Sequence, residues 1–279
     1  QISGRELRLY VGEYAASTNN GLYAYFPMNE GTGHQSLDAC TGSTTVIQWG
    51  SAGPEWVTDN TLKFGQSALK FGGEDGEVIW NLGGGASGTV STIIFKNSGT
   101  GTTGYRKWLV SFVFVPLLAT GETTVRDQTL LWWGTDTTNP KPLGVRVVSN
   151  QIRTYFQDNA STKTQDVVLD LAANVGKRIR VSVVYSDAAT PNIRTILTVE
   201  GSTGNYPTVV TNLNATDYAT PSDFVSVGRL CTSFTYPYTF NDRSAFGIID
   251  DIVIFKDYYT GNGVGPYILP GYQFREINI

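Results

Sequence analysis

Asp75 and Glu77 are the closest approach in this sequence to a hydrolytic pair of carboxylates. They are two residues apart, so on a strand their side chains would share one face. Glycoside hydrolysis needs two carboxyl groups about 5 to 9.5 Å apart across one cleft. The pair follows Gly72 and Gly73, however, in a segment with the composition of a turn. We interpret it as a solvated turn or as a ligand for a cation.

Other catalytic arrangements lack their essential residues. His34 is the only histidine, and no Gly-x-Ser-x-Gly motif accompanies it, so a nucleophilic triad is not expected. One histidine and the two distant cysteines, Cys40 and Cys231, do not make a standard zinc site. The two cysteines either pair with each other or are separate thiols. The sequence therefore predicts that the protein is not an enzyme.

Aromatic residues beside amides indicate a ligand-binding surface. Exposed rings offer a flat surface to a sugar, while neighbouring amides and charged groups bind its hydroxyl groups. Trp132 and Trp133 are consecutive, so in a regular strand one of them points away from the core. Tyr236 and Tyr238 precede the last apolar segment and either bind a ligand or pack over the edge of the fold. The residues that we predict to bind are Trp132, Trp133, Tyr236, Tyr238, Asn241 and Arg243.

The composition limits the partners. Charged residues make up 16% of the 279 residues, well below the roughly 25% of an ordinary soluble domain. The net charge of −4 gives no attraction for nucleic acid, and no apolar run approaches the roughly 18 residues of a membrane-spanning helix. Surfaces rich in Gly, Thr, Ser and Asn are common on secreted proteins and virus particles. We therefore predict an extracellular or virion-surface location, with no nucleic-acid partner and no membrane insertion.

Short β-branched and aromatic runs, separated by Gly, Asn, Asp and Pro, predict an all-β sandwich or barrel. No amphipathic helix is evident. The runs at Lys107–Pro116 and Phe246–Phe255 are apolar on both faces, so they are expected to be central and deeply buried. The remaining predicted strands are Gly21–Met28, Ser67–Phe71, Glu77–Asn81, Thr129–Trp133, Gly144–Val148, Ile152–Gln157, Arg178–Tyr185, Ile193–Glu200 and Phe224–Arg229.

Three segments carry a family pattern: Leu22–Gly33 followed by Asp38, then Phe64–Gly73, and finally Gly247–Phe255. In this order and spacing they resemble the laminin-G-like jelly-roll domains of the concanavalin-A-like superfamily. The resemblance implies a sandwich of two antiparallel sheets over residues 21–258. The Gly- and Thr-rich composition of the stretches near 83–104 and 208–220 predicts that they are surface loops inserted into it. Residues 1–20 are expected to be a lead-in segment and residues 259–279 a C-terminal arm.

The same resemblance implies a metal site. First and last strands run near each other in that family, so Glu30 and either Asp250 or Asp251 are expected to share a Ca²⁺ ion or one hydrogen-bonded turn. Because Asp250 and Asp251 are adjacent, they are expected to point to opposite faces of a strand.

The fold hosts proteins of several functional classes, so function has to be inferred from the site. The absence of a reactive group and the presence of aromatic and amide residues favour a non-catalytic module. We expect it to bind a cell-surface glycan or glycoconjugate. The alternative is a structural component of a virus or phage particle, such as a fibre or decoration protein, which would contact other subunits of a larger assembly.

Overall fold

The computed structural model describes fifteen stretches of the chain between Leu22 and Lys256. They comprise residues 22–28, 30–37, 46–49, 54–57, 67–73, 76–81, 107–134, 143–157, 162–186, 192–202, 205–207, 211–212, 224–233, 239–240 and 245–256. Within them the regular structure is almost entirely β, with a single 3-10 turn, η1 (Ala172–Asn174). The predicted all-β fold is confirmed.

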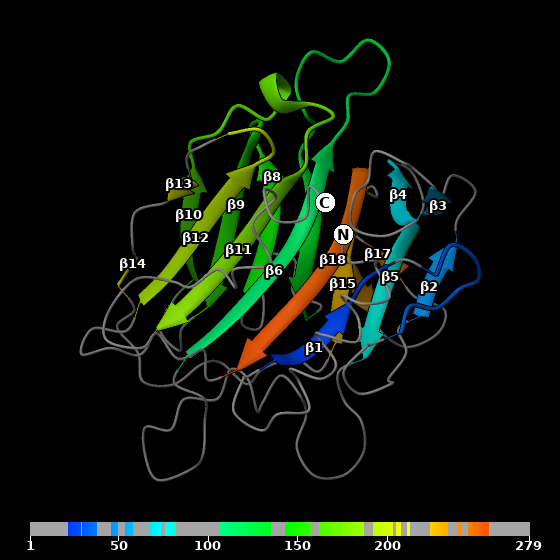
Figure 1. The fold of residues 1–279 in the computed structure, drawn as a ribbon, viewed down its shortest axis with the longest axis horizontal. Helices are drawn as coiled ribbons and strands as arrows, with labels where there is room; N and C mark the ends of the chain where they lie inside the picture. Colours follow the sequence, from blue (N-terminus) through cyan, green and yellow to red (C-terminus); the bar gives the residue numbers. More distant parts are fainter. Residues whose placement is uncertain are drawn as a thin grey trace, which may run out of the picture.

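The first layer is a nine-stranded antiparallel sheet (Figure 1). Its strands, in spatial order, are β13 (Asn205–Pro207), β12 (Asn192–Val199), β11 (Ile179–Ser186), β6 (Lys107–Pro116), β18 (Phe246–Lys256), β4 (Ala68–Gly72) and β3 (Glu55–Val57). Two further strands, β1 (Leu22–Phe26) and β14 (Thr211–Asn212), pair with β18 and β12 respectively.

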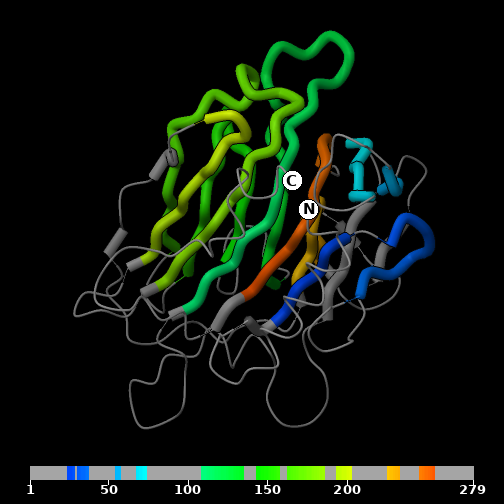
Figure 2. Tube along the Cα trace, viewed as in Figure 1, coloured from blue at the N-terminus to red at the C-terminus, as the bar shows by residue number. Residues whose placement is uncertain are grey.

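The second layer is a seven-stranded antiparallel sheet that stacks on the first, as the Cα trace in Figure 2 also shows. Its order is β10 (Thr162–Val167), β9 (Gln151–Gln157), β8 (Leu143–Val148), β7 (Gln128–Trp133), β15 (Phe224–Val227), β5 (Gly76–Asn81) and β2 (Val46–Trp49). Strands β16 (Cys231–Ser233) and β17 (Thr239–Phe240) form a separate two-stranded sheet.

The hydrophobic core fills the space between the two sheets. In β11 the side chains of Ile179, Val181 and Val183 belong to this core, whereas Arg180 and Ser182 lie on the opposite, outer face. The central position of β6 and β18 is confirmed by their burial. Phe112, Phe114, Ile252 and Ile254 are each at most 1% exposed.

The domain boundaries stay a prediction. Residues 1–20 and 259–279 lie outside the described residues, as does the insertion at 83–104. Of the insertion at 208–220, the structure describes only β14. The described strands begin at Leu22 and end at Lys256, so they fall inside the predicted sandwich of residues 21–258.

Candidate functional site

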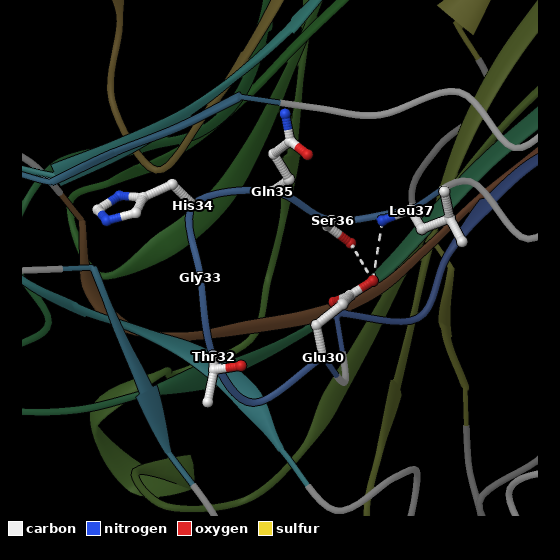
Figure 3. Close-up of a pocket in the computed structure, with 7 residues that line it drawn as sticks. All are labelled: Glu30, Thr32, Gly33, His34, Gln35, Ser36 and Leu37. Atoms are coloured by element: carbon white, nitrogen blue, oxygen red, sulfur yellow. Dashed lines mark hydrogen bonds between the residues drawn. The ribbon is translucent and has the colours of Figure 1, made fainter.

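The loop that follows β1 forms a pocket of about 550 Å³ (Figure 3). Seven residues from this one loop line it: Glu30, Thr32, Gly33, His34, Gln35, Ser36 and Leu37. Glu30, Thr32 and Ser36 contribute a carboxylate and two hydroxyls, and His34 and Gln35 add an exposed imidazole and an exposed amide. Such groups donate and accept hydrogen bonds in several directions, as a ligand with many hydroxyl groups requires.

The backbone of this loop turns sharply. Gly31 and Gly33 have φ values of 72° and 84°, in the left-handed region that favours glycine. Gly31 also lies close to Ser67, because a Cβ atom added to it would be 3.4 Å from the serine Oγ. The Glu-Gly-x-Gly sequence thus lets the chain curl back after β1.

Glu30 holds the loop in its curled form. Its Oε1 accepts a hydrogen bond from Ser36 Oγ at 3.1 Å and another from the Leu37 amide at 2.8 Å. In Figure 3 the carboxylate lies inside the curve of the loop, whereas the side chains of His34 and Gln35 point away from it. From β3, the Trp56 indole donates a 2.9 Å hydrogen bond to the Gly33 carbonyl and so fixes the tip of the loop.

The second oxygen of Glu30 is poorly satisfied. Oε2 is buried and accepts no hydrogen bond within the described part of the chain, and the same is true of Ser67 Oγ. A buried acceptor without a donor costs about 1 to 3 kcal/mol, and more when it is charged. Any donor that reaches Oε2 therefore stabilises this loop.

Among the described residues that line the pocket, Glu30 carries the one formal charge, and none is a lysine or arginine. Lys70, on β4, is paired with Glu55 of β3 at 2.8 Å, so its positive charge is already compensated. Of the described lining residues, it is therefore Glu30 that contributes a full charge to the pocket.

The two predicted tryptophans are both buried. Trp133 packs in the core, and Trp132 lies on the outer face of the seven-stranded sheet, so they do point in opposite directions. The expectation that one ring is exposed to a ligand is nevertheless wrong, because each is 0% exposed. Trp132 lies over Gly144, where an added Cβ would clash with its ring, and meets Tyr155 edge-on with ring centroids 5.3 Å apart.

The other predicted aromatic site cannot be placed. Tyr236, Tyr238, Asn241 and Arg243 lie outside the described residues, so their role as ligand contacts stays a prediction. Cys231 is a buried thiol at the start of β16, and Cys40 lies outside the described residues.

Asp250 and Asp251 lie in a different environment from Glu30. The pairing of β18 with β6 advances three residues, from Asp250 to Val253, while β6 advances two, from Val113 to Ser111. This β-bulge, with φ of 53° at Asp251, places both aspartates beside Arg180 on the outer face. The expectation that they point to opposite faces is therefore wrong.

The bulge creates a buried ionic cluster. Asp251 forms an ion pair with Arg180, and each side chain is 2% exposed. Arg180 also donates to Ser111 Oγ at 3.3 Å, and Asp250 Oδ1 accepts a hydrogen bond from the Asp251 amide at 2.8 Å. Burial, together with the negative charge of Asp251, raises the pKa of Asp250 well above its usual range.

The structure does not bring the predicted calcium ligands into one group. The contacts of Glu30 are to Ser36 and Leu37, while Asp251 is engaged by Arg180. Among the described residues no group of three or more His, Cys, Asp or Glu side chains is arranged to hold a metal ion. Of the predicted ligands, it is Glu30 that has a buried carboxylate oxygen without a donor in the described part of the chain.

The sequence predicts Glu30 as a site residue but does not predict the pocket around it. His34 is expected from sequence to be an ordinary loop residue, and Thr32, Gln35 and Ser36 carry no pattern of their own. The signal that could have found them is the Glu-Gly-x-Gly turn. A curled loop brings the residues that follow it around the glutamate side chain.

Comparisons with known proteins connect the chain to a fold. No protein-family model matches it, and a comparison with curated proteins gives no match. Solved structures do match. The botulinum neurotoxin serotype D binding domain has a TM-score of 0.52 at 13% identity, covering 84% of this chain and 48% of that one.

Two related complexes have the same TM-score of 0.52. The binding domain of botulinum neurotoxin DC in complex with SialylT is 12% identical and covers 86% of this chain and 48% of that one. The serotype D ligand binding domain in complex with N-acetylneuraminic acid is 13% identical and covers 87% and 49%.

At this level of identity the likeness shows the fold alone, and the chain spans about half the length of these structures. The protein is an all-β sandwich of the kind present in these binding domains. Within the described part of the chain, no helix is long and apolar enough to cross a membrane.

Proposed function

We propose that this chain is a non-catalytic carbohydrate-binding module and that the Glu30–Leu37 pocket contributes its binding site. The observation that carries the proposal is the Glu30 carboxylate. One oxygen holds the loop closed, and the other is buried without a donor in the described residues. Sugar hydroxyls are donors of the required kind.

The geometry supports binding rather than catalysis. A glycosidase needs a second carboxyl group across the cleft, and among the described residues that line the pocket Glu30 is the only acidic one. The matching solved structures are binding domains, in agreement with this interpretation. A pocket built from one surface loop should bind weakly, with Kd in the millimolar to micromolar range, about −4 to −8 kcal/mol.

Access to Oε2 requires a small movement, since its own loop covers it. His34 and Gln35 are exposed, and Leu37 is 47% exposed. Side chains of this kind change rotamer readily when a ligand binds. The backbone can stay in place, because Glu30 and Trp56 anchor it from two sides.

The test is titration calorimetry against a panel of glycans, beside an assay for release of reducing sugar. Glu30→Ala should abolish or strongly weaken binding. Glu122→Ala is the matched control, because Glu122 pairs with Arg126 in the connection between β6 and β7 and is not part of the pocket. Equal binding by both variants would remove the pocket from the proposal, and sugar release by the wild type would overturn the non-catalytic assignment.

The biological setting that we propose is extracellular, with a cell-surface glycan or glycoconjugate as the partner. The binding-domain neighbours support this setting. Tyr236 and Tyr238 are proposed as further contacts, and alanine variants of each should weaken binding without unfolding the domain. No binding to any glycan, together with a stable symmetric oligomer, would instead favour the alternative of a structural virion component.

A bound Ca²⁺ ion is an alternative proposal for the same oxygen of Glu30, and it excludes a ligand that depends on the negative charge of this carboxylate. Calcium prefers several oxygen ligands, including carboxylates and main-chain carbonyls, and the spare oxygen of Glu30 is one of these. A ligand that binds only the folded state raises its stability, so calcium should raise the melting temperature and EDTA should lower it. Identical melting curves with calcium and with EDTA would exclude the ion.

A further inference from the structure

We infer that the Glu30–Leu37 pocket discriminates among sugars by charge, binding amino sugars most tightly, neutral sugars less tightly and acidic sugars least. This inference rests on the proposed function and adds the substrate class. Its basis is the negative charge of Glu30 in the pocket lining. No described residue that lines the pocket is a lysine or arginine.

Lysine and arginine side chains elsewhere in the described structure form ion pairs with acidic residues. Lys70 pairs with Glu55 at 2.8 Å, beside the Trp56 that anchors the loop. In the connection between β6 and β7, Arg126 pairs with Glu122 at 2.9 Å. Beside the ends of β11 and β12, Arg178 pairs with Glu200 at 2.7 Å. An acidic sugar entering the pocket would meet Glu30 without a described cation to compensate its carboxylate.

The position of the carboxylate makes this repulsion effective. Glu30 lies inside the curve of the loop (Figure 3), and its Oε2 is buried, so water screens it less than an exposed side chain. The interaction of two unit charges about 6 Å apart changes an affinity by roughly 3-fold at an effective dielectric constant of about 80. At an effective dielectric constant of about 20 the change is roughly 100-fold. An ammonium group gains by this factor, and a carboxylate loses by it.

The inference separates this chain from its structural neighbours. One of those domains is in complex with N-acetylneuraminic acid, a sugar that carries a carboxylate. The fold is shared, yet the pocket described here has the wrong charge for such a ligand. Ligand class is therefore expected to differ while the architecture stays the same.

The experiment uses sugars that share a pyranose ring but carry a positive charge at C2, no charge, or a negative charge at C6. Glucosamine, glucose and glucuronic acid form one series, and galactosamine, galactose and galacturonic acid form a second. Titration calorimetry at low ionic strength should give the order amino, neutral, acidic in at least one series, with roughly 3- to 100-fold between steps. Raising the salt concentration should compress the differences.

Two variants locate the cause. Glu30→Gln keeps the shape and one acceptor oxygen but removes the charge, so it should bring the three affinities of a series together. Glu122→Gln removes a carboxylate outside the pocket and should leave the order unchanged. Melting curves of both variants confirm that they are folded.

The outcomes distinguish the inference from the proposed function. Binding with no dependence on charge, or a dependence that survives Glu30→Gln, overturns the inference and leaves the binding function intact. Tighter binding of the acidic sugars also overturns it. Failure of all six sugars and of the glycan panel overturns the proposed function, and the inference with it.

Discussion

Glu30 and the Asp250–Asp251 pair show how differently this sandwich uses its carboxylates. Glu30 is half-buried in a surface loop, with one oxygen bonded and the other lacking a donor among the described residues. The two aspartates lie on the outer face of the nine-stranded sheet, buried beside Arg180. The first arrangement leaves an interaction for a ligand to complete. In the second, both aspartates are engaged by groups of the protein itself, so the cluster is structural.

The largest expected effect is on stability, from Arg180→Met. Removing one partner of a buried ion pair leaves an uncompensated charge, which typically costs about 3 to 5 kcal/mol. Asp251 would be left 2% exposed, next to Asp250. Urea denaturation of wild type and variant measures the difference in the free energy of unfolding.

Lys70→Met is the control for this prediction. Its pair with Glu55 is exposed, and such pairs are worth at most about 1 kcal/mol. The double variant Arg180→Met, Asp251→Asn should recover most of the loss, because neither member of the pair is then left charged and alone. Asparagine also tolerates the φ of 53° at position 251. A loss below about 1 kcal/mol in Arg180→Met would mean that the cluster is open to water.

The next effect is the pH dependence that Asp250 contributes. In the folded state the pKa of Asp250 is raised, first by burial and then by the negative charge of Asp251. The hydrogen bond from the Asp251 amide and the positive charges of Arg180 and Arg178 lower this pKa, but by less. The folded state therefore binds this proton more tightly than the unfolded state does. The contribution to stability is greatest below the ordinary aspartate pKa and declines as the pH rises towards the folded-state pKa.

Asp250→Asn should remove this decline. The variant keeps an Oδ1 acceptor for the Asp251 amide but cannot ionise. We expect it to be more stable than wild type near neutral pH and to show a flatter dependence of unfolding free energy on pH. A variant that is less stable than wild type at neutral pH would indicate that the Asp250 charge is needed by the two arginines.

The smallest expected effect is that of Glu30→Gln on stability. The glutamine retains an acceptor for Ser36 and Leu37, and the site is partly open to solvent. Substitutions of this kind usually change the free energy of unfolding by less than about 1 kcal/mol. Thermal melting is the measurement, and a loss above about 3 kcal/mol would assign Glu30 the same structural role as Asp251.

The fold could be predicted because its signals are local. Alternation in Arg178–Tyr185 and the largely apolar sequences of β6 and β18 follow from which face of each strand is buried. The spacing of apolar residues and the composition of a single segment are sufficient for such predictions. They correctly identify Phe112 and Ile254 as buried residues, because neither run offers a polar face to solvent.

The environments of the predicted site residues depend on features of the structure that a sequence pattern does not contain. One inserted residue in β18 placed Asp250 and Asp251 on the same face, where strict alternation predicted opposite faces. Trp132 does point away from the core, yet it is 0% exposed, because direction within a strand does not determine what covers a side chain. The pocket itself arises from the path of one loop, which glycines at positions 31 and 33 permit but do not define.

The most direct test of the pocket uses the fact that His34 is the only histidine in the chain and lies in the pocket lining. Selective labelling of histidine gives one imidazole signal in a heteronuclear NMR spectrum, and that signal reports on this site alone. Titration with a glycan that binds in calorimetry should shift the His34 signal, with a midpoint equal to the calorimetric Kd, and the Glu30→Ala variant should lose the shift. A glycan that binds by calorimetry and leaves the His34 signal unmoved would show that carbohydrate is bound elsewhere on the molecule and would contradict the proposed binding site.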